Sequence, residues 1–304
     1  MSLFPNEPVV GIAVAAATAA AAVPDAALAV HLLNAWRRGI GRSLRRARGR
    51  LPLHTLYLQP QGVLAWNTVW NTVDARPAEV DTTAAFDNFD AWCRVNPNSE
   101  ARLFVSGHLL HSLVADPALR LRDEDAVRNY ARQQFVHYHG THARQWPIAV
   151  WSSASYSGAC AAHSIDLDAV RATAASHDVH LHSIAPAWSA GLASLTRQVP
   201  SLARPGPSAV ALVEGSLVTW MIASAGTITS MQQRYLDAPR TGLLTELLDR
   251  VVEETGPFAH PATVVGWGLE DGPVPPALRA NVISPPGGRD AAACWMLDSM
   301  AHNT

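Results

Sequence analysis

The sequence contains no lysine, so all 23 of its basic residues are arginine. This excludes the usual phosphate loop, G-x-x-x-x-G-K-[ST], because that loop needs a lysine to reach the phosphates. The chain also lacks the G-x-S-x-G elbow of α/β hydrolases and the H-E-x-x-H pair of zinc peptidases. We find no complete catalytic or cofactor-binding motif, which favours a non-catalytic protein over an enzyme.

Cysteine and charge are scarce as well. The three cysteines, Cys93, Cys160 and Cys294, are far apart and form no C-x-x-C pair. Their odd number and wide spacing exclude a disulfide framework and a zinc ribbon, and they fit a reducing cytoplasm. Charged residues make up only 16% of the 304 residues and hydrophobic ones 48%, which excludes general disorder. We therefore predict a cytoplasmic protein with two cores of ordinary size.

The first 50 residues differ in composition from the rest. Residues 9–23 form an apolar, alanine-rich run that stops at Pro24-Asp25. Because alanine contributes little to membrane insertion and the run is divided, we expect a helical extension or residues upstream of the true start. A weak membrane-associating helix and a true membrane span remain as alternatives.

A short basic arm follows this run. It consists of seven arginines: Arg37, Arg38, Arg42, Arg45, Arg46, Arg48 and Arg50. With only two acids before residue 51, the segment carries +5, and the remainder of the chain carries −7. An acidic body argues against a broad nucleic-acid surface. We interpret the arm as a solvated helix face or tail, or as a contact for an anionic membrane surface or partner at the inner membrane.

After residue 50, strands and helices follow one another in two similar cycles. In the first cycle the pattern predicts strands at 54–59, 63–69, 101–106, 147–151, 158–163 and 179–184, and helices at 82–96, 123–138, 167–176 and 187–198. In the second it predicts strands at 208–213, 216–223, 227–232 and 262–266, and a helix over 243–252. The proline- and glycine-rich segment 201–207 separates the cycles. We therefore expect a duplicated α/β lobe, with domains at 1–50, 51–200 and 201–304.

Several local strings resemble the degenerate actin-like proteins of bacterial secretion and pilus assembly, which include PilM, MshI and the cytoplasmic domain of GspL. The strings are Ala101–Gly107, the helix from Asp123 that ends in Phe135-Val-His-Tyr138, Trp146–Trp151, Val179–Pro186 and the hairpin at Glu214-Gly215. The resemblance covers about residues 52–270. It implies a degenerate actin-like ATPase fold made of two RNase H-like lobes.

The chain departs from this family where nucleotide would be held. Actin-like ATPases grip nucleotide between two glycine-bearing hairpins with acidic residues, which position a metal-bound water while backbone amides contact the phosphates. Here the first turn, Gln59 to Gly62, has no carboxylate, and its proline removes an amide donor. The second keeps one acid, Glu214 before Gly215, whose simplest interpretation is a turn residue. We interpret both turns as vestigial, so ATP and Mg²⁺ are not expected as cofactors, although nucleotide binding stays open.

Histidine gives the strongest remaining signal for chemistry. His137, His139 and His142 form an H-x-H-x₂-H string, and His180 and His182 lie two apart on a predicted strand. Imidazoles at such spacing could ligate zinc or copper. No carboxylate anchor accompanies them, which favours ordinary polar residues over a metal site.

Taken with the resemblance, these features predict a non-catalytic cytoplasmic scaffold of a type IV pilus or type II secretion-like assembly platform. It would bind the tails of inner-membrane assembly proteins and no nucleic acid. The alternatives are a nucleotide-dependent phosphotransferase or ATPase on the same fold, a metal-dependent enzyme that uses the histidine string, and a regulator that binds nucleic acid through the arginine arm.

Overall fold

A computed structural model describes residues 53–70, 77–121, 123–153, 156–190, 206–224, 227–235, 246, 249–250, 253, 262–267 and 282–283. The predicted N-terminal extension with its seven arginines lies outside these residues, as do Cys294 and most of the predicted linker 201–207. The predicted helix 243–252 is described only at residues 246, 249 and 250, which are helical.

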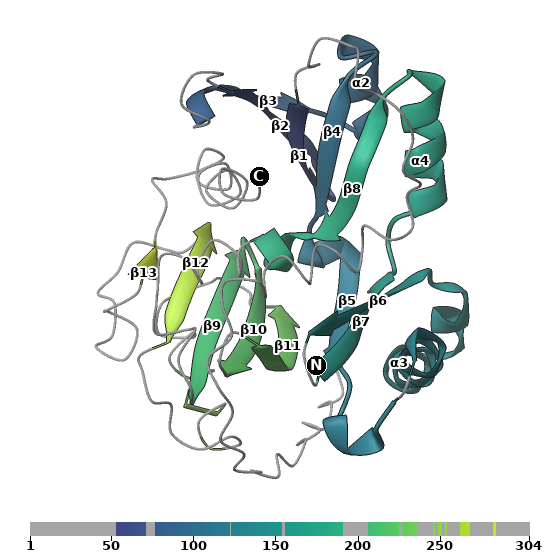
Figure 1. Ribbon diagram of the computed structural model, residues 1–304, viewed down its shortest axis with the longest axis vertical. Coiled ribbons are helices and arrows are strands. Elements are labelled where there is room, and N and C mark those ends of the chain that lie inside the picture. The colour runs from purple at the N-terminus through teal and green to yellow at the C-terminus, as the bar shows by residue number, and fades with distance from the viewer. Residues whose placement is uncertain are drawn as a thin grey trace, which may run out of the picture.

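Ten strands form two five-stranded sheets (Figure 1). The first sheet contains β1 (Leu53–Gln59), β2 (Gly62–Trp70), β3 (Pro77–Phe86), β4 (Glu100–Val105) and β8 (His180–Pro186). The second contains β9 (Pro207–Glu214), β10 (Leu217–Ser224), β11 (Thr227–Tyr235), β12 (Thr263–Trp267) and β13 (Val282–Ile283). Both sheets are mixed, with three antiparallel strands followed by two parallel ones.

The two sheets have the same topology. Their strand orders are β3-β2-β1-β4-β8 and β11-β10-β9-β12-β13. In each, the first strand in the chain pairs antiparallel with the second and parallel with the fourth: β1 with β2 and β4, and β9 with β10 and β12. The sequence predicted this duplication, and the repeated strand order confirms it.

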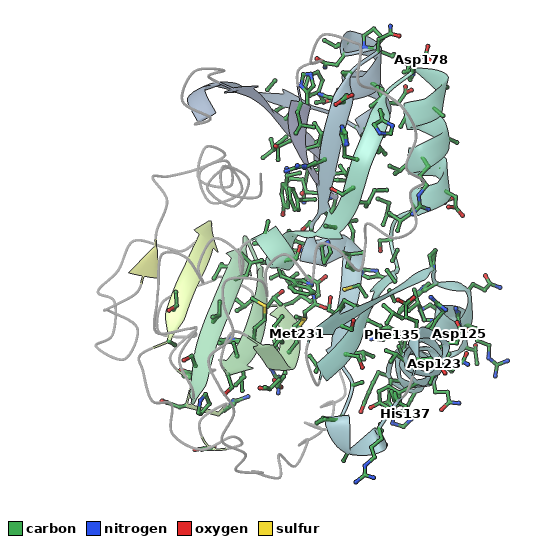
Figure 2. The ribbon with its side chains drawn as sticks, in the orientation of Figure 1. Asp123, Asp125, Phe135, His137, Asp178 and Met231 are labelled. Atoms are coloured by element: carbon green, nitrogen blue, oxygen red, sulfur yellow. The ribbon has the colours of Figure 1, made fainter. Side chains whose placement is uncertain are left out.

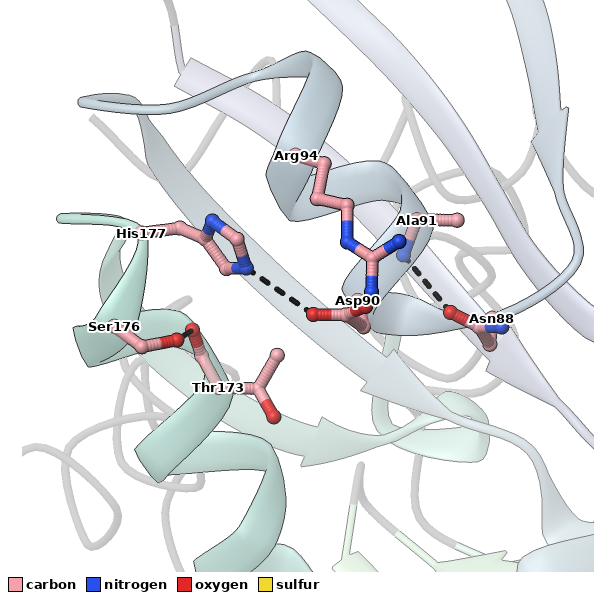
Figure 3. Close-up of polar contacts among 7 residues, drawn as sticks. All are labelled: Asn88, Asp90, Ala91, Arg94, Thr173, Ser176 and His177. Atoms are coloured by element: carbon pink, nitrogen blue, oxygen red, sulfur yellow. Dashed lines mark hydrogen bonds and ion pairs between the residues drawn. The ribbon is translucent and has the colours of Figure 1, made fainter.

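Two helices cover the outer face of the first sheet, α2 (Phe89–Val95) and α4 (Leu167–Ser176). Side chains of Asn88 and Asp166 cap their first turns, because each accepts hydrogen bonds from backbone amides there. At the far end of α4, His177 Nε2 lies 3.1 Å from Asp90 Oδ1 on α2 (Figure 3). The two helices are therefore joined to each other as well as to the sheet.

The predicted helix 82–96 begins later than the sequence indicated. Residues 82–86 belong to strand β3, which pairs antiparallel with β2, and the helix starts only after Asn88. The prediction was wrong for the first part because no strong turn signal separates the two elements, whereas the Asn88 side chain fixes the helix start by accepting a hydrogen bond from Ala91 N. The third strand of the lobe was missed for the same reason.

A small subdomain is inserted between β4 and α4. It consists of three short 3-10 turns, η1 (Gly107–Leu109), η2 (Pro117–Leu119) and η3 (Thr141–Gln145), strands β5 (Leu110–Val114), β6 (Ile148–Ser153) and β7 (Tyr156–Ala162), and helix α3 (Glu124–His139). The strands form a sheet in the order β5-β7-β6, and α3 packs on it through Ala131 and Phe135. Figure 2 shows Phe135 and His137 on this helix, beside the inserted sheet.

One apolar core runs through both lobes. Its buried side chains include Tyr57 and Phe104 of the first sheet, Trp151 of the inserted sheet, and Leu212 and Met231 of the second sheet. Figure 2 labels Met231. A second core lies beneath α2 and α4 and contains Leu56, Trp92 and Leu103. Burying apolar surface between the lobes stabilises one relative arrangement of them.

Candidate functional site at the junction of the two lobes

A buried carboxylate connects the two lobes. Glu214, the last residue of β9, is only 2% exposed. Its Oε1 accepts hydrogen bonds from the Tyr57 hydroxyl at 2.7 Å and from Ser106 Oγ at 3.0 Å. The amide of Gly107 donates to both carboxylate oxygens, at 3.2 Å to Oε1 and 3.1 Å to Oε2. All three donors belong to the first lobe, so the single acid of the second hairpin is bonded across the junction.

Strand register and a tight turn bring these groups together. Tyr57 lies on β1, where it is paired with Phe104 of β4, so both side chains leave the same face of the sheet toward the second lobe. Strand β4 ends at Val105, and Ser106 caps η1 by accepting a hydrogen bond from the amide of His108. This cap places Ser106 Oγ and the Gly107 amide side by side at the strand end, facing Glu214.

Further bonds extend the junction on both sides of the carboxylate. His108 Nε2 lies 2.7 Å from the backbone oxygen of Glu214, at hydrogen-bonding distance. Gln233 of β11 accepts a hydrogen bond from the amide of Ser112 at 2.9 Å, which connects the second lobe to the inserted subdomain. Gly107 leaves no room for a side chain, because a Cβ there would lie 2.7 Å from Glu214 Oε2 and from Leu217 Cδ2. Three parts of the chain therefore meet in close contact at Gly107.

Burial dominates the electrostatics of the junction. It raises the pKa of Glu214, and the hydrogen bonds from Tyr57, Ser106 and Gly107 and the charge of His108 only partly offset the increase. Burial, together with the charge of Glu214, raises the pKa of Tyr57 well above its ordinary value. Tyr57 therefore keeps its proton and remains a hydrogen-bond donor over the physiological pH range.

The two turns that we interpret from the sequence as vestigial lie at different places in this arrangement. Gln59 ends β1, two residues beyond Tyr57, and Gly62 begins β2 with a φ of +139°. A Cβ on Gly62 would lie 2.2 Å from the carbonyl oxygen of Phe86, so this turn is packed against the end of β3. Gly215 has a φ of +62° with open space around it, as a tight hairpin requires. The structure thus separates Glu214, which points into the junction, from the turn that follows it.

The histidines of the 137–142 string do not converge. His137 contacts Tyr138, with ring centroids 4.9 Å apart, and His142 contacts Trp146 edge-on at 5.3 Å. His139 instead stacks on His111, with centroids 4.0 Å apart. On strand β8, His182 Nε2 lies 2.8 Å from Glu100 Oε2. Within the described part of the chain, no three histidine, cysteine or acidic residues are grouped so that they could hold a metal ion.

The two described cysteines are buried. Burial raises the pKa of Cys93 to about 12 and that of Cys160 to about 11. Both thiols stay protonated near neutral pH and are therefore poor nucleophiles.

Sequence reasoning missed the first-lobe half of the junction. Tyr57, Ser106, Gly107 and His108 form no recognised motif, and Tyr57 lies 49 residues before the other three, which are consecutive. One signal was available: Glu214 ends the run Val-Ala-Leu-Val, and an acid adjoining a buried strand needs polar partners. Which residues provide those partners depends on the packing of the lobes.

No family model matches this sequence, and no curated protein does. Among solved structures, the chain is similar to the cytoplasmic domain of EpsL, an inner-membrane component of the type II secretion system of Vibrio cholerae. The identity is 14% and the TM-score 0.51, over 82% of this chain and 93% of that domain.

Two further structures are more distant, each covering 72% of this chain and 82% of its own, with a TM-score of 0.48. One is a Bacteroides thetaiotaomicron protein of unknown function with an actin-like ATPase fold, at 9% identity, and the other is the PilM-PilN type IV pilus biogenesis complex, at 10%. The duplicated strand order and the match to the EpsL domain confirm the predicted fold, so this chain has an actin-like fold of two similar lobes.

Proposed function

We propose that this chain is a non-catalytic scaffold of a type IV pilus or type II secretion-like assembly platform, where it binds cytoplasmic tails of inner-membrane components. The observation that carries the proposal is the bonding of Glu214 across the lobe junction. The similarity to the EpsL domain, which belongs to an inner-membrane component of a secretion system, supports the choice of process. None of the described helices has both the length and the apolar character needed to cross a membrane.

The junction argues against phosphate chemistry because its acid is buried and bonded across the lobes. A carboxylate that positions a metal-bound water must present an oxygen to that water, whereas Glu214 is only 2% exposed. Oε1 of Glu214 accepts from Tyr57, Ser106 and Gly107, and Oε2 from Gly107. Withdrawing the carboxylate would break the hydrogen bonds that three buried donors make to it, at a cost of about 1–3 kcal/mol each.

The apolar packing around the carboxylate supports the same conclusion. Tyr57, Phe104 and Trp188 of the first lobe share one core with Leu212 and Met221 of the second. A scaffold benefits from such a fixed arrangement, because a preorganised surface loses less conformational freedom when a partner binds. The proposal therefore assigns the fold to holding binding surfaces in place.

Synthetic peptides with the sequences of the cytoplasmic tails of the host's pilus and secretion inner-membrane proteins provide the test. We expect at least one labelled peptide to bind the full chain in fluorescence anisotropy, with a scrambled peptide of the same composition as control. The affinity is expected to be the same with and without Mg²⁺ and ATP. Failure of every tail to bind would refute the assignment to this process.

Calorimetry with Mg²⁺ and ATP tests the main alternative, a nucleotide-dependent phosphotransferase or ATPase. We expect no binding heat and no release of phosphate from the full chain. Stoichiometric, micromolar binding with turnover would overturn the non-catalytic assignment, whatever the peptides do.

A further inference from the structure

Three imidazole rings stack in the inserted subdomain. His111 comes from β5, His139 is the last residue of α3, and His163 follows β7. His111 is the middle ring: its centroid lies 4.0 Å from that of His139 and 4.1 Å from that of His163, with interplanar angles of 15° and 23°. We call these three residues the histidine stack. It joins the C-terminal end of α3 to the two strands beneath it.

The stack is part of the surface on which α3 is docked. Trp146 lies against all three rings, at centroid distances of 5.3 to 5.7 Å, and also against Phe135 of α3 at 6.3 Å. Phe135 and Ala131 complete the contact of the helix with the sheet. Helix docking and ring stacking therefore form one continuous surface.

The near-parallel rings do not fit a shared metal ion. A metal lies in the plane of each imidazole that ligates it, along the lone pair of a ring nitrogen. Planes that are 15° to 23° apart and about 4 Å from one another do not meet at a point close to their nitrogens. The stack instead brings together three imidazoles, a side chain whose ordinary pKa, near 6.5, lies close to neutral pH.

The environment disfavours that charge on the inner rings. Burial, and to a smaller extent the charges of His139 and His163, lowers the pKa of His111 to about 3. Burial, then the charge of His139, lowers the pKa of His163. His163 Nε2 is buried and has no hydrogen-bond partner, whereas its Nδ1 lies 2.6 Å from Ser164 Oγ. Protonating either ring would thus place a cation in a half-buried stack.

The other ionisable groups around the stack are cationic or neutral. From α3, Arg132 reaches across to the backbone carbonyls of Arg144 and Trp146. Segment η3 carries His142 and Arg144, while β5 contributes only His111. Strands β6 and β7 contain no charged residue.

We propose that the histidine stack makes the docking of α3 depend on pH: the helix is docked while His111 and His163 are neutral, and it is released in mild acid when they take up protons. A histidine protonated more readily in the released state favours that state as the pH falls below its ordinary value, near 6.5. With a pKa of about 3 in the docked state and the ordinary value near 6.5 in the released state, His111 alone should lower the equilibrium constant for docking about 30-fold at pH 5 relative to neutral pH. Release would expose Phe135 and the face of the inserted sheet.

Hydrogen exchange of the full chain between pH 7.5 and pH 5.0 tests this directly. Exchange rates of α3 amides are divided by the intrinsic rate at each pH, and the amides of α4 provide an internal reference. In the wild type we expect the protection of α3 to fall at least tenfold relative to that of α4. In His111→Phe, which keeps an aromatic ring in the stack but cannot take up a proton there, the fall is expected to be smaller than in the wild type, because only His163 then disfavours its proton in the docked state.

The matched control is His182→Gln, which removes an exposed histidine from the first lobe and is expected to behave as the wild type. Protection of α3 that follows α4 over the whole range would overturn the proposal, and so would an unchanged fall in His111→Phe. If that variant does not fold, imidazole NMR of the wild type decides. A His111 resonance that titrates near pH 6.5 while α3 stays protected contradicts the proposed coupling.

Discussion

Replacing Glu214 by alanine should lower the free energy of unfolding, because it removes the hydrogen bonds that Glu214 makes across the lobe junction. The substitution removes the acceptor that the Tyr57 hydroxyl, Ser106 Oγ and the Gly107 amide share, in a site where Glu214 itself is 2% exposed. Each buried hydrogen bond lost costs about 1–3 kcal/mol. Because water can enter the space left by the carboxylate, we expect a total loss of about 3–5 kcal/mol in the free energy of unfolding. Glu214→Gln keeps one acceptor oxygen, but its amide would face the Gly107 N–H, so about 1–3 kcal/mol is expected.

Urea unfolding followed by far-UV circular dichroism measures these differences, and tryptophan fluorescence tests whether both lobes unfold together. Glu100→Gln is the control, since Glu100 pairs with His182 at a partly exposed site and should cost about 1 kcal/mol or less. If Glu214→Ala lowers the free energy of unfolding no more than this control does, the carboxylate does not hold the junction together. It would then be free for another partner.

Three more predictions concern the junction and the inserted sheet. Gly107→Ala should lower the unfolding free energy by about 1–3 kcal/mol in urea titration, because the new methyl group would lie 2.7 Å from Glu214 Oε2 and Leu217 Cδ2; wild-type stability would contradict the close packing. Gly158→Ala should lower the melting temperature in calorimetry, since its Cβ would lie 2.4 Å from the carbonyl oxygen of Leu113, and an unchanged melting temperature would be evidence against this contact. Burial raises the pKa of Glu214 in the folded state. The stability that this residue contributes is therefore fully present below its pKa in the unfolded chain, about 4.3, and is lost as the pH rises through its pKa in the folded chain. The stability advantage of the wild type over Glu214→Gln should therefore shrink between pH 4 and pH 7 in urea titrations, and an advantage that grows with pH would show the pKa to be lowered.

The sequence by itself determined most of the local structure. The pattern of apolar residues predicted β1, β2, β4 and β8, and also β9 and β10 of the second lobe. It also predicted helices at 123–138 and 167–176, and the side chains of Asp123 and Asp166 cap the corresponding helices α3 and α4. These features depend on neighbours a few residues apart. Where local signals were weak, as across residues 82–88, a strand end was mistaken for a helix start.

Only the tertiary structure decided which distant residues meet. The partners of Glu214 lie 107 to 157 residues away, and nothing in the local pattern pairs Tyr57 or Ser106 with a hairpin of the other lobe. The same holds for the histidines: the sequence grouped His139 with His137 and His142, but the fold stacks it on His111 and near His163. Side-chain spacing along a helix fixes which face a residue occupies, whereas the packing of that face against other elements fixes its chemistry.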